Sequence, residues 1–296
     1  MISINKTYEN FEFKPNTEPC AYADSGETIR FECKDCYADQ LNADNIDFST
    51  MDMNHNNPIS GPLYVNGAQV GDVLKVEIKN IEMADQASMC VRKGVGIYEV
   101  EGCHCRRFPI EGNVVKFDGG IEIPIKPMVG VMGTSPAAGA VSTQSPGEHG
   151  GNMDIRELGI GSTVYFPVNV DGALLSMGDI HAVQGDGETA ICAMEVSGAV
   201  TVKVEVIKTD KYIPTPFIVT EKSYYTTAAD KSLDECSIAA ARKMHRFIME
   251  NLNFDDGQAA MLLSVMGNLR ITQVVNPEKG CMMEFPRSVF DWKDSV

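Results

Sequence analysis

Three of the five histidines in this 296-residue chain lie in short segments that also contain glycine and carboxylate or amide side chains. These segments are MNHNNPISGP around His55, EHGGNMD around His149 and GDIHAVQGDGE around His181. Glycine beside such side chains lets the backbone approach a small ligand closely. Two or three imidazoles with a carboxylate can bind zinc and leave one position for water. The segments therefore predict a site for metal-assisted hydrolysis.

The nine cysteines also include two motifs of the kind that bind metals. Cys33 and Cys36 form a C-x-x-C pair, and Cys103 and Cys105 flank His104. A structural zinc site usually combines two knuckles of matched spacing, which these motifs do not supply. An odd number of cysteines also cannot close into a complete disulfide framework. We therefore expect reduced thiols, as in a cytosolic protein.

The charge of the chain excludes several classes of partner. Aspartate and glutamate total 41 against 25 lysines and arginines, which gives a net charge of −16. Such a charge repels nucleic acids and anionic lipid surfaces. No apolar run approaches the roughly 18 residues of a membrane span, and the first residues lack the apolar stretch of a signal peptide. We expect a cytoplasmic protein that binds neither nucleic acid nor membranes.

Most of the chain has the pattern of β-strands. Polar and apolar residues alternate over residues 73–81 and 200–207, as in half-buried strands. Shorter apolar runs, separated by glycine and proline, occupy residues 121–125, 164–168 and 190–196. This pattern predicts a mainly β protein with a β-sandwich or barrel-like body, and no crossover helix before residue 230.

The last fifth of the chain has a helical pattern. Residues 232–251 predict a helix with apolar positions spaced three and four residues apart. Its apolar stripe would consist of Ile238, Ala241, Met244, Ile248 and Leu252. Asp255 or Asp256 would cap a second helix at 257–266, which Gly267 would end.

Two further strands, 269–275 and 281–285, are expected after the helices. The proline-rich residues 214–216 suggest a hinge in front of this part. We therefore divide the chain into a β-rich catalytic body, 1–213, and a small α+β subdomain, 214–296.

One element is repeated within the body. Residues 62–72 (PLYVNGAQVGD) resemble residues 167–179 (PVNVDGALLSMGD), and the second copy is longer by two residues. The plain interpretation is a duplicated strand and turn, in which Asp72 and Asp179 share a structural role. The second copy alone is followed by a polar cluster that begins at His181. This difference favours a functional role for the cluster.

Longer segments resemble a known family. HGGNMD, STVYFPVNVDGALLSMGDIHAVQGDGE and NPISGPLYVNGAQVGDVLKVEI resemble the acetamidase/formamidase family, and MLLSVMGNLRITQVVNP extends the resemblance into the helical part. The resemblance implies hydrolysis of a small amide to carboxylate and ammonia on a mainly β fold. Some members are mono-zinc hydrolases with a glutamate near the metal, including lactam-cleaving enzymes. The chain corresponds to the shorter form of the family, and we expect a homodimer.

Within this frame, four residues are candidate metal ligands. They are His55, His181, Asp154 and Asp179. Imidazole and carboxylate ligands favour zinc. The aspartate-rich loops could also hold a calcium ion as a second, structural ion.

Three residues are candidates for catalysis. Glu148 or Glu188 would serve as the general base that takes a proton from water. His149 would either orient the leaving amine or brace its loop. Backbone or side-chain groups would bind the substrate and its oxyanion. The candidates for this role are Gly130, Gly133 and Asn152.

Two other functions remain open at this point. An amidase could instead use a cysteine nucleophile, Cys192 or Cys281, with a base from elsewhere in the fold. A β-sandwich protein could also hold a cation for structure and perform no catalysis. Chelation, zinc rescue and ammonia release distinguish these alternatives from a metal-dependent amidase.

Overall fold

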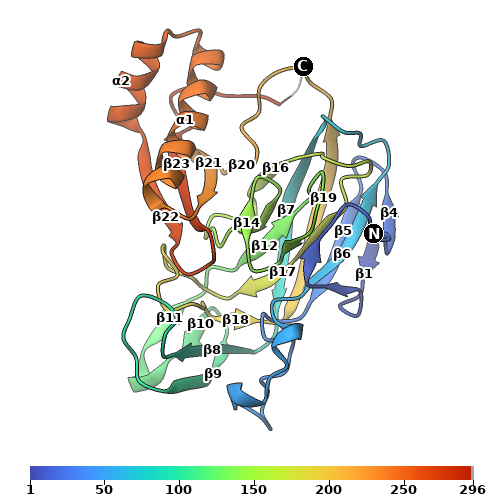
Figure 1. Ribbon diagram of the computed structural model, residues 1–296, viewed down its shortest axis with the longest axis vertical. Helices are drawn as coiled ribbons and strands as arrows, with labels where there is room; N and C mark the ends of the chain where they lie inside the picture. Colours follow the sequence, from blue (N-terminus) through green and yellow to red (C-terminus); the bar gives the residue numbers. More distant parts are fainter. Residues whose placement is uncertain (295–296) are drawn as a thin grey trace.

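Two large β-sheets contain nearly all the strands of the computed structural model, which describes residues 1–294 (Figure 1). The first sheet has nine strands in the order β1-β5-β19-β7-β16-β20-β21-β23-β22. In this order the strands are Ile2–Ile4, Thr28–Cys33, Gly198–Ile207, Val73–Met83, Thr163–Pro167, Phe217–Val219, Ser223–Asp230, Lys279–Pro286 and Asn268–Gln273.

The second sheet has twelve strands, nine of which follow the order β11-β10-β9-β8-β18-β17-β12-β15-β14. These nine are Glu122–Pro124, Val114–Lys116, Cys103–Glu111, Gln86–Arg92, Glu195–Val196, Leu175–His181, Met128–Gly133, Gly150–Asn152 and Pro146–Gly147. Strand β6 (Ile59–Val65) branches from β17 and pairs with β2 (Glu9–Asn10) and β4 (Ala21–Ala23). A separate small sheet joins β3 (Glu12–Phe13) to β13 (Val141–Ser142). Short 3-10 turns occupy Phe48–Thr50 (η1), Met53–His55 (η2) and Asp118–Gly120 (η3).

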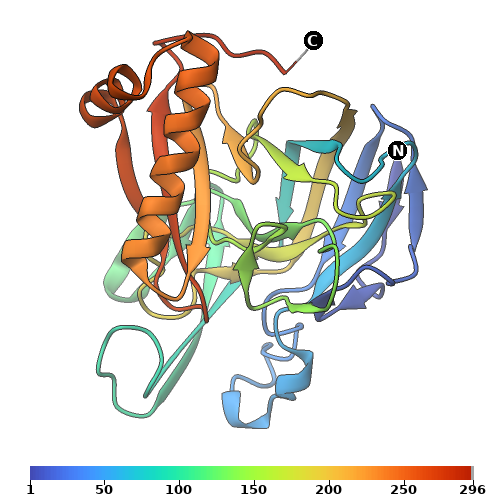
Figure 2. The ribbon, with the colours of Figure 1, turned by 45° about the horizontal axis from the view of Figure 1, so that its top comes forward.

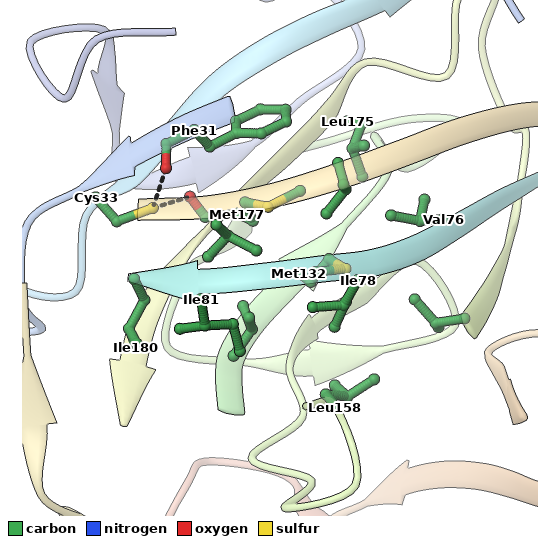
Figure 3. Packing of buried hydrophobic residues seen from close by; sticks show 14 of the residues in the cluster. Phe31, Cys33, Val76, Ile78, Ile81, Met132, Leu158, Leu175, Met177 and Ile180 are labelled. Atoms are coloured by element: carbon green, nitrogen blue, oxygen red, sulfur yellow. Dashed lines mark hydrogen bonds between the residues drawn. The ribbon is translucent and has the colours of Figure 1, made fainter. Parts of the chain in front are cut away.

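The main hydrophobic core lies between the two sheets. In Figure 3, Val76 and Ile78 of β7 pack near Leu175, Met177 and Ile180 of β17. All five side chains are fully buried. For Val76 and Ile78 this follows from the alternation of apolar and polar residues along β7, which turns the apolar side chains to one face. The prediction of a mainly β sandwich-like body is therefore confirmed.

One predicted strand is mostly a loop. Within 190–196 only Glu195–Val196 (β18) pairs as a strand. Ile191 has a φ of 85°, which ends any extended run before Cys192. The loop carries Cys192 into the wall of a cavity that is described below.

Both predicted helices are present, and they pack together at one end of the molecule (Figures 1 and 2). Helix α1 spans Leu233–Leu252, with Ser232 as its N-cap. Helix α2 spans Asp256–Met266, where Asp255 and Gln258 form a capping box. No helix within residues 1–294 combines the length and the apolar character that a membrane span requires.

The predicted apolar stripe of α1 needs a correction. The buried residues of the helix are Cys236, Ala240, Met244, Phe247 and Ile248. Ile238 is 40% exposed, because it lies two positions, or about 200° around the helix, from both Cys236 and Ala240. The helix therefore packs on β21 and β23 through a face next to the one we expected.

The strands of the last fifth of the chain continue the first sheet. Strand β20 pairs with β16, so that Phe217 lies opposite Tyr165. Tyr165 and Phe217 share a second hydrophobic cluster with Phe247 of α1. The division of the chain after residue 213 stays a prediction.

The two copies of the repeated element have turns that contact each other, but their Gly-Asp pairs lie in different environments. The turns of the two copies bind each other, since Val65 N–H donates to Gly172 O and Gly172 N–H donates to Ala68 O, both at 2.9 Å. Asp72 lies in a turn before β7 and pairs with Lys208, whereas Asp179 is buried inside β17. The two additional residues move Gly178-Asp179 from the turn into the strand, so the expected shared role is wrong.

The cysteines also differ from expectation. Cys90 of β8 and Cys105 of β9 lie directly opposite each other and form a disulfide. The other seven cysteines are free thiols. The expectation that all nine are reduced is therefore wrong.

Candidate active site

Five buried titratable side chains meet beside β17. Asp154, His181 and Glu188 form one group, and Asp179 and Glu195 form a second group together with the half-buried Cys36. Within each group the potential ligand atoms lie within 4.8 Å of one another. Four carboxylates thus surround a single imidazole.

Strand pairing brings most of these side chains together. Asp179 and His181 lie two residues apart on β17 and therefore point to the same side of the sheet. His181 is directly opposite Glu195 of β18. Asp154, Asp179 and Glu188 have φ values of 48°, 58° and 42°, which are uncommon for residues other than glycine and occur preferentially at functional sites.

Gly130 of β12 leaves the space that two of the carboxylates occupy. A Cβ atom at this position would lie 2.5 Å from Oδ2 of Asp179 and 2.8 Å from Oδ1 of Asp154. Gly133 has a different role, because a Cβ atom there would meet the backbone of His149 and Gly151. Both glycines thus permit close packing around the segment HGGNMD.

The polar atoms of the site are only partly satisfied. His181 Nδ1 lies 2.8 Å from Gln184 Oε1, while its Nε2 lies 3.1 Å from Glu195 Oε2 and 3.2 Å from Asp179 Oδ1. Within the described residues, four atoms are buried and make no hydrogen bond. They are His181 Nε2, Glu195 Oε2, Asp179 Oδ1 and Glu188 Oε2. Four carboxylates against one imidazole leave buried negative charge uncompensated, which is costly, so this excess of carboxylates fits a bound cation.

The pKa values reflect this crowding. Burial raises the pKa of Asp154 to about 7 and that of Asp179 to about 6, and the charge of Asp179 adds to the shift of Asp154. Burial also raises the pKa of Glu188 well above its ordinary value. Burial alone would lower the pKa of His181, but Glu195 and Asp179 outweigh it and raise that pKa.

Two asparagines hold the carboxylates in place. Asn276 Nδ2 donates to Asp154 Oδ2 at 2.7 Å and to Asn152 O at 3.2 Å. With its nitrogen turned towards the carboxylates, the Asn152 amide lies 3.3 Å from Oδ2 of both Asp154 and Asp179. The N–H groups of Asn152 then orient the two carboxylates.

A cavity of about 140 Å³ adjoins the group. Its wall includes Cys36, Asp179, Glu188, Glu195 and Asn276. This volume is well below that of a typical pocket for a drug-sized ligand, so it suits a molecule of a few heavy atoms.

Of the seven predicted ligands and catalytic residues, Asp154, Asp179, His181 and Glu188 come together. The structure places the other three elsewhere. His55 is exposed at the end of η2, where its Nδ1 lies 2.8 Å from Asp52. Glu148 is 74% exposed in its side chain and pairs with Lys243 of α1. His149 is buried with its ring against Phe13. Neither Glu148 nor His149 contributes to the cavity wall.

Sequence reasoning missed Glu195 and one role of Cys36. Glu195 lies in the segment AMEVSG, which has no histidine and only one glycine, so only its pairing with His181 reveals it. The sequence marks Cys36 only as half of the C-x-x-C pair with Cys33. In the structure its partner Cys33 lies in the main core, and Cys36 alone reaches the cavity.

Neither candidate cysteine nucleophile is well placed for attack. Cys192 lines the cavity, but its Sγ donates to Cys90 O and burial raises its pKa to about 11. Cys281 packs beneath α1 in the second hydrophobic cluster. Both environments oppose formation of the thiolate that nucleophilic attack requires.

A two-sheet β fold with a small cavity and a buried carboxylate–imidazole group is the arrangement of an enzyme that acts on a small molecule. The comparisons with known proteins make the assignment specific. The model of the Acetamidase/Formamidase family matches residues 3–142 and 125–292. The chain belongs to this family, and hence to the hydrolases that act on the carbon–nitrogen bonds of linear amides.

Solved structures agree with this assignment. An acetamidase from Bacillus halodurans is 38% identical, with a TM-score of 0.95 over 98% of this chain and 99% of that one. A protein from Thermoanaerobacter tengcongensis, described as a predicted acetamidase/formamidase, is 36% identical, with a TM-score of 0.94 over 97% and 96% of the two chains. In sequence, a formamidase from Methylophilus methylotrophus is 29% identical in an alignment of 255 positions that covers 66% of this chain and 63% of the relative.

Proposed function

We propose that this chain is a metal-dependent amidohydrolase that cleaves a small linear amide of formamide or acetamide size to carboxylate and ammonia. The observation that carries the metal dependence is the set of unpartnered buried atoms around His181 Nε2. The small cavity volume supports the size of the substrate.

The donor atoms suit zinc. His181, Asp154, Asp179 and Glu195 would hold the ion, since imidazole nitrogen and carboxylate oxygen are both common zinc ligands. The surplus of carboxylate oxygens would also accommodate an additional calcium ion. A bound zinc ion lowers the pKa of water towards neutrality and polarises a carbonyl oxygen.

Glu188 is the general base of this proposal. Its carboxylate lines the cavity and has an unpartnered oxygen, so it can accept a proton from the attacking water and later deliver it to the departing amine. Glu148, the other candidate, is engaged with Lys243 at the surface. Asn152 and Asn276 keep the aspartates oriented while the substrate binds.

The test compares His181→Ala with Asp72→Asn. We expect His181→Ala to lose bound zinc and ammonia release while the protein remains folded, because the main core lies between the sheets. Asp72→Asn should cost about 1 kcal/mol or less and keep turnover, since its partner Lys208 is exposed and the amide oxygen of asparagine can still accept from Gln69 N–H. Zinc analysis, thermal unfolding and ammonia release measure these effects.

The proposal fails if His181→Ala retains metal and turnover. It also fails if a chelator leaves wild-type activity unchanged, whereas inactivation that zinc reverses supports it. The homodimeric state and the cytoplasmic location are part of the same proposal, and gel filtration and cell fractionation test them.

A further inference from the structure

Three sulfur atoms lie close together on the β8–β9 hairpin. Cys90 and Cys105 form the disulfide between directly opposed positions, and Cys103 lies two residues before Cys105 on β9. Residues two apart on a strand point to the same face. The Sγ of Cys103 accordingly lies 3.9 Å from that of Cys105.

The two ends of this sulfur group differ in their surroundings. Cys90 is 1% exposed and lines the cavity of the candidate active site. Cys103 is an exposed free thiol. It shares a surface groove of about 630 Å³ with Cys105 and Arg106. The group therefore leads from the protein surface to the cavity wall.

Hydrogen bonds connect Cys90 to the rest of that wall. Its N–H donates to the hydroxyl of Tyr37 at 3.0 Å, and the Sγ of Cys192 donates to its carbonyl oxygen at 3.4 Å. Tyr37 directly follows Cys36, which belongs to the second group of potential ligands. The disulfide thus links β9 to the part of β8 that supports the cavity.

We propose that the Cys90–Cys105 disulfide is a reversible thiol switch whose entry point is Cys103 and whose reductant is a small thiol. In the first step the Cys103 thiolate attacks Cys105 Sγ. A Cys103–Cys105 bond forms, the Cys90–Cys105 bond breaks, and Cys90 leaves as a thiolate that takes up the proton lost by Cys103.

In the second step a small thiol attacks the exposed Cys103 sulfur and releases Cys105 as a thiol. A second small thiol then frees Cys103 from the mixed disulfide. Overall, two small thiols are oxidised to one disulfide and the protein disulfide is reduced to two thiols. The switch decides whether the cavity wall is cross-linked to β9.

This inference does not depend on the proposed hydrolysis. It follows from the access that each sulfur has to solvent, because exchange requires a thiolate that can reach its target.

The experiment follows the disulfide directly in the full-length protein. Wild type, Cys103→Ser and Cys20→Ser are incubated with 2-mercaptoethanol, and the fraction of Cys90–Cys105 disulfide is measured over time by alkylation and peptide mass spectrometry. We expect Cys103→Ser to lose the disulfide about ten-fold more slowly than wild type. Cys20→Ser should match wild type, because this thiol donates to Pro62 O away from the hairpin.

A Cys90→Ser variant isolates the intermediate. Under mild oxidation it should form a Cys103–Cys105 disulfide, since its usual partner is missing. Equal reduction rates in wild type and Cys103→Ser would overturn the inference. So would wild-type protein whose Cys90 and Cys105 are alkylated before any reductant is added, or a Cys90→Ser variant that forms no Cys103–Cys105 bond.

Discussion

His149 illustrates how burial alone can change the chemistry of a side chain. It is 5% exposed, and burial lowers its pKa from 6.5 to about 4. Within the described residues its Nε2 has no hydrogen-bond partner. The ring is therefore neutral in the folded protein near pH 7, and it supports the loop through its contact with Phe13.

This neutral histidine should make stability depend on pH. The unfolded chain takes up the proton at a higher pH than the folded chain, so the contribution is complete above about pH 6.5 and decreases as the pH falls towards 4. Between pH 7.5 and 4.5 we expect wild type to lose about 2 to 3 kcal/mol more unfolding free energy than His149→Phe, which cannot titrate. Denaturant unfolding at both pH values measures this difference, and equal losses in the two proteins would contradict it.

Individual site residues could be predicted only where their surroundings in the sequence were distinctive. Asp154, His181 and Glu188 lie in glycine-containing segments, and the structure brings them together. His55 has similar surroundings but lies on the surface, because local composition does not determine which way a loop faces. Glu195 has no such surroundings, and only strand pairing places it opposite His181.

At the scale of elements, the period of the apolar residues predicted the strands and helices well. The alternation of polar and apolar residues predicted β7 and β19. The capping residues and apolar spacing predicted the ends of both helices to within one residue. The order of strands in the sheets was not predictable, because it depends on contacts between residues far apart in the chain. The face of α1 was also misjudged, since its apolar residues extend around more than one face.

Helix α1 offers a direct test of which face carries its stability. Met244→Ala should cost about 2 to 5 kcal/mol, because this side chain is fully buried against the sheet. Ile238→Ala should cost less than about 1 kcal/mol, because 40% of this side chain is exposed. Chemical denaturation of the two variants measures both values, and similar costs would contradict the packing described for the helix.

At the scale of the whole molecule, the first sheet runs through both parts of the chain. Strand β16 pairs with β7 on one side and with β20 on the other. A chain that ends at Pro214 would lack β20 to β23 and would expose the edge of β16 together with Tyr165. Unpaired edges and exposed apolar surface favour aggregation.

We therefore expect truncation after Pro214 to give an aggregated or inactive protein. Gel filtration and ammonia release measure the outcome, with the full-length chain as the reference. A soluble fragment with full activity would show instead that the last part folds and functions as a separate appendage.

The hydrogen bond from Asn276 to Asp154 has a consequence for the time at which the protein becomes active. Synthesis proceeds from the N-terminus, and early parts of a chain can fold while later parts are still being made. The carboxylates and His181 are translated before Asn276, which orients Asp154 and lines the cavity. A nascent chain thus carries the carboxylates and His181 before their orienting partner has been made, and it acquires an ordered site only when the segment around Asn276 emerges from the ribosome.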